Sequence, residues 1–68
     1  MTRGQADDAA LSLRQLGFGA VVVLKDAGPG FRAGCVDRGG WVFFSTEAAV
    51  EVFMVEVVAR TPLFGGLR

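Results

Sequence analysis

The chain has 68 residues, of which 51% are hydrophobic, and its seven acidic and seven basic side chains leave no net charge. So high an apolar content excludes an intrinsically disordered chain. The balanced charge argues against a surface that attracts nucleic acid by bulk electrostatics. At this length we expect one domain, residues 1–68, which buries only about 60% of its unfolded surface and is marginally stable by itself.

The sequence does not indicate a disulfide or a metal site, which commonly stabilise small domains. A single cysteine, Cys35, excludes a disulfide within the chain. The lack of histidine argues against a zinc site. We therefore expect no metal and no cofactor. Stability should come from association instead, with a second copy or with a protein partner.

Membrane insertion and secretion are not indicated. The longest apolar runs, Phe18–Leu24 and Val52–Val55, are far shorter than the roughly 20 residues that span a bilayer. Asp7 and Asp8 interrupt the apolar segment that a signal peptide requires. We expect a cytoplasmic protein without membrane contact. The bias towards glycine, alanine, valine and arginine is typical of a GC-rich genome and suggests a bacterial or phage source.

The first predicted element is a short helix over Ala6–Leu16. Asp7 and Asp8 would then lie in its first turn, where the helix dipole favours negative charge. Gly17 follows at the position of a left-handed C-cap. Residues Met1–Gln5 are expected to be frayed. The buried stripe of this helix should consist of Ala9, Leu13 and Leu16.

Three strands are predicted next, over Phe18–Lys25, Phe31–Asp37 and Trp41–Ser45. All are short and rich in β-branched or aromatic residues. The segments between them, Asp26–Gly30 and Asp37–Gly40, are rich in glycine and aspartate, which favour tight turns. Connections this short predict antiparallel strands.

A second helix is predicted over Ser45–Thr61, with its first residue or Thr46 as the N-cap and Pro62 as its stop. The alternative for Ala48–Ala59 is a fourth strand, because valine is a good strand former. From Ala48 to Ala59 only Glu51 and Glu56 are polar, so the helix has no wide polar face. Such a helix must be covered on more than one side, either within one chain or between chains.

The sequence therefore predicts an α+β fold of order α-β-β-β-α, with a three-stranded antiparallel sheet and both helices on one face. This element order resembles that of the double-stranded RNA-binding domain family and covers the whole chain. The resemblance would imply RNA contacts through a lysine cluster at the start of the second helix. That place reads Thr46-Glu47-Ala48-Ala49 here, so no residue of the family motif is carried over.

Strand register follows from the turn lengths. With loops of Ala27–Gly30 and Arg38–Gly39, directly opposed residues share a face. A slip of one residue in either turn would exchange members of the two faces. The helix-covered face is predicted to carry Ala20, Val22, Leu24, Phe31, Ala33, Cys35, Val42 and Phe44. The uncovered face is predicted to carry Val21, Val23, Lys25, Arg32, Gly34, Val36, Trp41 and Phe43.

Catalytic chemistry is not indicated. The chain has neither histidine nor tyrosine. Cys35 lies in the middle of a strand, where a buried small hydrophobe is expected rather than a nucleophile. Glu47 and Glu51 are expected on a solvated helix edge. The glycine pairs around Phe18 and Pro29 precede or join strands, so they indicate turns and caps rather than a phosphate-binding loop. We expect no enzyme.

The predicted function is that of a non-enzymatic protein-binding module, either self-associating as a homodimer or acting as a stoichiometric inhibitor or adaptor of a larger assembly. Phage-encoded inhibitors of the anti-CRISPR type are similar in size and in their lack of motifs. The alternative is a small RNA- or single-strand-binding domain that uses the same sheet face. The exposed side of the second helix is a further candidate contact. The predicted protein-binding residues are Trp41, Phe43, Arg32, Val21, Val23 and Val36.

Overall fold

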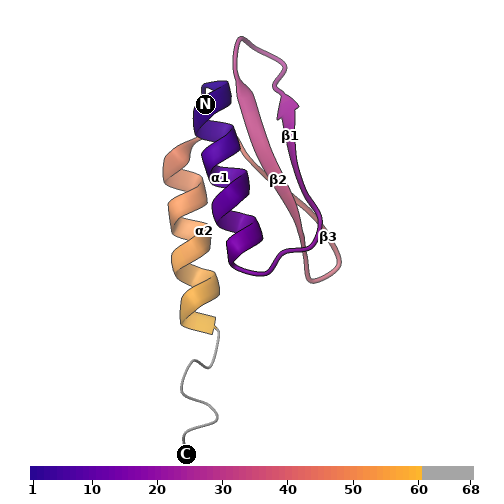
Figure 1. The fold of residues 1–68 in the computed structure, drawn as a ribbon, viewed down its shortest axis with the longest axis vertical. Coiled ribbons are helices and arrows are strands. Elements are labelled where there is room, and N and C mark those ends of the chain that lie inside the picture. The colour runs from indigo at the N-terminus through magenta and orange to yellow at the C-terminus, as the bar shows by residue number, and fades with distance from the viewer. Residues whose placement is uncertain (61–68) are drawn as a thin grey trace, which may run out of the picture.

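The computed structural model describes residues 1–60 and has two layers, a pair of helices and a sheet (Figure 1). The three strands form one antiparallel sheet in the order β1-β2-β3, and both helices lie on one of its faces. The predicted α+β class and element order are confirmed. The predicted end of the second helix at Thr61 and Pro62 lies outside the described residues. The elements are α1 (Arg3–Gln15), β1 (Val21–Lys25), β2 (Phe31–Asp37), β3 (Gly40–Phe44) and α2 (Glu47–Arg60).

α1 begins at Arg3 because Thr2 and Gln5 form a capping box. The Thr2 hydroxyl accepts a hydrogen bond from the Gln5 N–H at 3.1 Å, and the Gln5 side-chain carbonyl accepts one from the Thr2 N–H at 2.8 Å. This reciprocal pair satisfies two backbone donors at the helix start. The predicted start at Ala6 was therefore wrong, and the first turn contains no acidic residue.

The segment before α1 is tied to the sheet rather than frayed. The Met1 amino group donates to the carbonyls of Phe31 at 3.3 Å and Ser45 at 3.0 Å. The Phe31 N–H donates in turn to the Met1 carbonyl at 2.8 Å. These bonds join the start of β2 to the segment between β3 and α2, so the expectation of a frayed Met1–Gln5 was wrong.

Gly17 ends α1 as predicted, with φ of 105°. This conformation is favourable for glycine alone among common residues. The Phe18 N–H donates to the Leu13 carbonyl at 3.3 Å, which folds the chain back at the helix end. The Phe18 ring then packs against Phe53 of α2 at 5.6 Å between centroids. Because Phe18 belongs to this turn, β1 begins at Val21, three residues later than predicted.

The loop between β1 and β2 contains the five residues Asp26–Gly30, as the strand bounds predicted, rather than the four residues Ala27–Gly30 assumed for the register. The Asp26 N–H donates to the Gly30 carbonyl at 2.9 Å. The Asp26 carboxylate accepts from the Ala27 N–H, also at 2.9 Å. Both bonds place Asp26 in the loop, so β1 is moved by one position against β2 relative to the register predicted with a loop of Ala27–Gly30.

The shift exchanges the two faces of β1. Val21 and Val23 pair with buried residues of β2 and lie on the helix-covered face, so their predicted place on the uncovered face was wrong. Val22 and Leu24 take that place. The register of β2 against β3 agrees with the prediction. The uncovered face, called the open face below, consists of Val22, Leu24, Arg32, Gly34, Val36, Trp41 and Phe43.

β2 and β3 are joined by the predicted two-residue turn, Arg38-Gly39. Asp37 pairs with Gly40 on either side of it. Both turn residues have positive φ, 51° for Arg38 and 148° for Gly39. Two-residue hairpin turns commonly require positive φ because it matches the twist of the strands. Glycine adopts it freely, whereas arginine does so at a cost.

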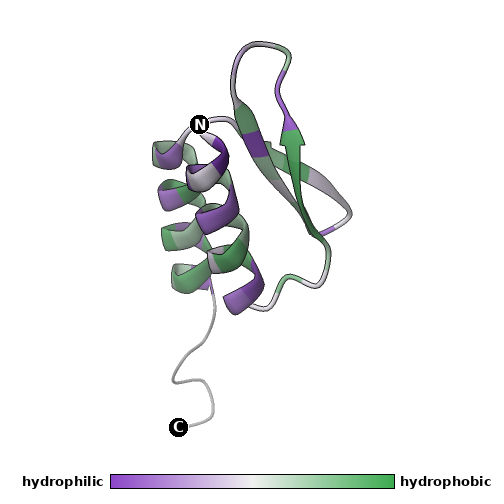
Figure 2. Cartoon of the chain, turned by 45° about the horizontal axis from the view of Figure 1, so that its top comes forward, coloured by the Kyte–Doolittle hydropathy of each residue, from purple (hydrophilic) through white to green (hydrophobic). Residues whose placement is uncertain are grey.

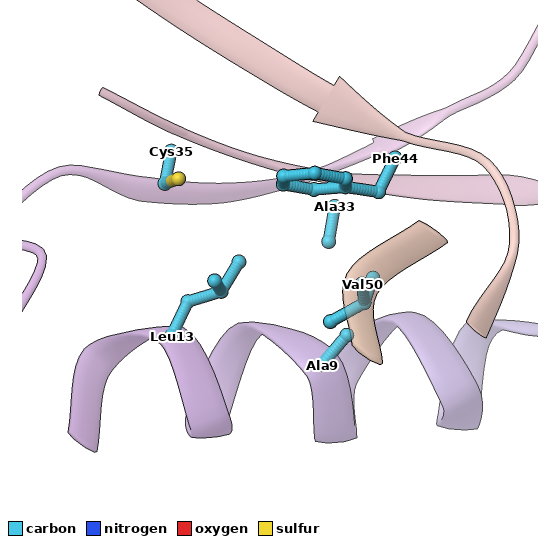
Figure 3. Close-up of a cluster of buried hydrophobic side chains, with 6 residues drawn as sticks. All are labelled: Ala9, Leu13, Ala33, Cys35, Phe44 and Val50. Carbon is cyan, nitrogen blue, oxygen red and sulfur yellow. The ribbon is translucent and has the colours of Figure 1, made fainter. Parts of the chain in front are cut away.

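The core lies between α1 and the sheet, with a contribution from the first turns of α2 (Figure 3). Its side chains are small, apart from one leucine and one phenylalanine, so the layers approach closely. Phe53 of α2 adds a half-buried ring against Phe44, at 4.9 Å between centroids. The buried cluster consists of Ala9, Leu13, Ala33, Cys35, Phe44 and Val50.

α2 is a helix throughout its described length, so the alternative of a fourth strand was wrong. The Thr46 hydroxyl accepts from the Ala49 N–H at 3.1 Å and caps its start. Val50 is its one buried residue. Within residues 1–60, no helix has both the length and the hydropathy needed to cross a membrane.

Arg38→Asn should stabilise the fold, because asparagine adopts a positive φ at lower cost than arginine. We expect the free energy of unfolding to rise by about 1 kcal/mol, measured by urea denaturation. Arg38→Ala is the matched control, since it removes the charged side chain and keeps the unfavourable conformation. An equal gain in both variants would contradict the backbone explanation.

Candidate functional site

The open face is a continuous apolar surface that carries large exposed side chains. Trp41 is 49% exposed and Phe43 is 42% exposed, and Leu24 and Val36 beside them are also exposed. Isolated exposed apolar residues are common on proteins, but neighbouring aromatic and aliphatic groups on one sheet face indicate a contact surface. Helices cover only the other face of this sheet.

Gly34 has no side chain and so leaves the space that the Phe43 ring occupies. The two residues are directly opposed in β2 and β3. A Cβ atom at Gly34 would lie 2.5 Å from the ring carbons Cδ1 and Cε1 of Phe43, which is closer than van der Waals contact allows. The Cδ1–Cε1 edge of the ring therefore lies against the glycine, which is buried. An aromatic ring that covers a glycine across two strands also fixes their register.

Three side chains stack side by side across the open face. The Arg32 guanidinium lies 5.0 Å from the centroid of the Phe43 ring, within the range of a cation–π interaction. On its other side Phe43 stacks with Trp41 at 5.9 Å, with an angle of 13° between the rings. We call Arg32, Phe43 and Trp41 the open-face stack. It presents a cation and two aromatic groups in a fixed arrangement.

Arg32 has one charged neighbour among the described residues. An Nη1 atom lies 4.0 Å from the Asp26 carboxylate, which is a long ion pair. Its Nε is buried without a hydrogen-bond partner. The hydrogen bond from the Ala27 N–H lowers the pKa of Asp26, and the Ser45 side chain and Arg32 add to this effect. Asp26 is therefore charged at neutral pH and attracts the guanidinium.

Four of the six residues predicted for protein binding lie together on the open face. Val21 and Val23 do not, because the longer loop turns them toward the helices. Val22 and Leu24 were missed, and the signal for them was an aspartate at the first position of a loop, where its side chain can hydrogen-bond the next backbone N–H. Lys25, also predicted for the open face, lies on the covered side over the Phe31 ring. The residues that the structure brings together are Trp41, Phe43, Arg32 and Val36.

Cys35 is fully buried in the core, as the sequence predicted (Figure 3). Burial raises the pKa of its thiol, and the nearby charge of Asp37 adds to the increase. A thiol of this kind is protonated at neutral pH and is a poor nucleophile.

A shallow hollow of about 230 Å³ lies between α1 and α2. Its rim includes the carboxylates of Asp8, Glu47 and Glu51. Glu47 already accepts a hydrogen bond from the Gln5 side chain at 2.9 Å. Pockets for small molecules usually measure about 300–1,000 Å³, so this hollow is smaller than an ordinary substrate site. Residues 1–60 contain no group of acidic or cysteine side chains placed to hold a metal ion.

No protein-family model matches the chain, and neither the curated proteins nor the solved structures gave a match. None of these comparisons therefore supports the resemblance in element order to the double-stranded RNA-binding domain. At the start of α2, where that family has its lysines, Thr46 caps the helix and Glu47 bonds to Gln5.

Gly34→Ala should displace the Phe43 ring, because the added methyl group overlaps it. We expect a loss of about 1–3 kcal/mol in the free energy of unfolding and a changed near-ultraviolet circular dichroism signal from Trp41. In a Phe43→Ala background the same substitution should cost much less, since the obstructing ring is gone. Equal costs in both backgrounds would show that the glycine is needed for another reason.

Cys35 should react slowly with a thiol reagent in the native protein and rapidly in denaturant. Burial hides the sulfur, and the raised pKa of the thiol lowers its thiolate fraction. The measurement is the rate of modification at neutral pH with and without urea. Fast modification of the folded chain would contradict the buried position.

Proposed function

We propose that the chain is a non-enzymatic protein-binding module and that it contacts its partner through the open face. The observation that carries the proposal is the open-face stack, in which Trp41 and Phe43 are about half exposed and are held by Arg32. Tryptophan and arginine are the residues most enriched among energetic hot spots of protein interfaces.

The energetics favour contact with another protein. Burying a large apolar side chain contributes about 1.5–3 kcal/mol, and two such side chains are adjacent here. The stack is already assembled in the free chain by Gly34 and Asp26. Binding therefore orders few additional groups, which lowers the entropic cost of association.

The chemistry of the stack defines the kind of partner. An apolar surface on the partner would fit Trp41, Phe43 and the aliphatic residues beside them. The Arg32 guanidinium at the edge of the rings fits a carboxylate next to that surface. The described residues offer no assembled acid–base or nucleophilic group, so the module acts by occupancy, as a stoichiometric inhibitor or an adaptor does.

Single-stranded nucleic acid is the alternative ligand, because bases stack on aromatic rings. The distribution of charge is unfavourable for it. Arg32 is the one cationic residue on the open face, since Lys25 lies on the covered side. A strand of phosphates would find little electrostatic attraction here.

Trp41→Ala should abolish capture of the protein partner without unfolding the chain, because the side chain is half exposed. The wild-type chain serves as bait in a bacterial lysate, and the captured protein is then purified and titrated. We expect Trp41→Ala to cost at least about 2 kcal/mol, or roughly 30-fold in Kd.

Val58→Ala is the matched control, because Val58 is an exposed valine of α2, a helix on the covered side of the sheet. It should leave the Kd unchanged. Unchanged binding by a folded Trp41→Ala variant would overturn the open-face proposal. Salt-sensitive binding of a labelled single-stranded oligonucleotide, lost in Trp41→Ala, would favour the alternative instead.

A further inference from the structure

α2 carries a second apolar surface, on its side away from α1. Ala48, Val52, Val55 and Ala59 recur at spacings of four, three and four residues, which places them in one line along a helix. We call these four residues the outer stripe. Val52 is 59% exposed and Val55 is 68% exposed. Figure 2 shows hydrophobic residues along the whole of α2, with a few hydrophilic ones between them.

The inward side of α2 uses other residues. Val50 is buried, and Phe53 and Met54 pack against the core. These positions lie on the far side of the helix from the outer stripe. Within residues 1–60 the stripe residues stay exposed.

The outer stripe is symmetric about its own midpoint. Read in either direction it runs alanine, valine, valine, alanine, with the same spacing. An antiparallel second copy therefore sets Val52 against Val55 in the two central layers and Ala48 against Ala59 at both ends. Valines meet at the centre and alanines meet at the ends, so each layer joins two side chains of equal size.

The charges beside the stripe distinguish the two orientations. Glu51 and Glu56 flank it on opposite sides, at the heptad positions that pair across two helices. In a parallel pair each Glu51 would face Glu56 of the other copy, which is repulsive. In an antiparallel pair Glu51 faces Val58 and Glu56 faces Ala49, so no carboxylates are opposed and the helix dipoles also oppose each other favourably.

A hollow on α2 fits the same arrangement. Met54, Val55, Val58 and Ala59 line an open depression of about 420 Å³ that extends from the outer stripe towards the inward-facing Met54. In helix pairs a side chain of one helix inserts between four side chains of the other. Val52 of an antiparallel second copy lies at the level of Val55 and next to this hollow.

We propose that two copies of this chain associate through the outer stripes of α2, with the helices antiparallel. The stripe from Ala48 to Ala59 is about 16 Å long. This length gives an interface below the roughly 1,200 Å² of standard stable complexes, so the dimer is weak and depends on concentration. The open face lies on the opposite side of the molecule, so the dimer presents two open faces and is independent of the proposed function.

The first test is the mass of the full chain in solution, by sedimentation equilibrium between about 10 µM and about 1 mM. We expect the mass of the wild type to rise toward twice that of the monomer. Val55→Asp should stay monomeric, because its carboxylate would be buried in the central layer. Trp41→Ala is the control and should associate as the wild type does, although it loses the partner.

Three outcomes would overturn the proposal. A wild-type mass that stays monomeric would show that another segment of the chain or a different protein covers the stripe. Association of Val55→Asp equal to that of the wild type would place the contact elsewhere. Loss of association in Trp41→Ala alone would move it to the open face. Partner capture by Val55→Asp separates this result from the proposed function.

Cross-linking tests the orientation in a Cys35→Ala background. A mixture of Ala48→Cys and Ala59→Cys chains should form a disulfide between copies. Ala59→Cys alone should form none, because its two sulfur atoms would be about 16 Å apart in an antiparallel pair, too far for a disulfide. A disulfide in Ala59→Cys alone would indicate a parallel pair and contradict the proposed arrangement.

Discussion

The packing of α1 on the sheet is the interaction on which the rest of the structure depends. Ala6, Ala9, Ala10 and Leu13 form its buried side, and three of these are alanines, so the helix axis can approach the strands closely. α1 covers most of β1 and β2. A sheet of three strands has little uncovered area left on this face. α2 therefore contacts the edge strand β3 and the side of α1.

This division of space explains why a chain with so much apolar sequence has so small a core. The first helix and the strands satisfy most of the burial that 60 residues can provide. The surplus remains on two surfaces that face opposite directions, the open face and the outer stripe. Each surface also carries charged side chains: Arg32 on the open face, and Glu51 and Glu56 beside the outer stripe. In the two proposed contacts these charges would determine what can approach, while the apolar groups would supply the affinity.

The sequence was sufficient for the elements, their order and the turn at Arg38-Gly39, because hydrophobic periodicity, glycine and caps are local signals. It was insufficient where pairs of local hydrogen bonds determined the outcome. Thr2 and Gln5 extended α1 by three residues, and the Asp26 side chain lengthened one loop. Four of six candidate contact residues were placed correctly because the two-residue turn Arg38-Gly39 fixes the register of β2 against β3. The two errors fall on β1, whose residues Val21 to Leu24 are apolar on both faces and give no preference.

The same ambiguity in β1 has a consequence for how this protein can change over evolutionary time. A deletion of one residue from the loop Asp26–Gly30 would turn β1 over while leaving valine or leucine against the helices. The core would stay apolar, so the deletion would change the stability of the fold little and selection on stability would act on it weakly. The exterior would exchange Val22 and Leu24 for Val21 and Val23, and the outline offered to a partner would differ. Length variation in one loop can therefore change the exposed surface of the sheet in descendants of this chain without rebuilding the fold.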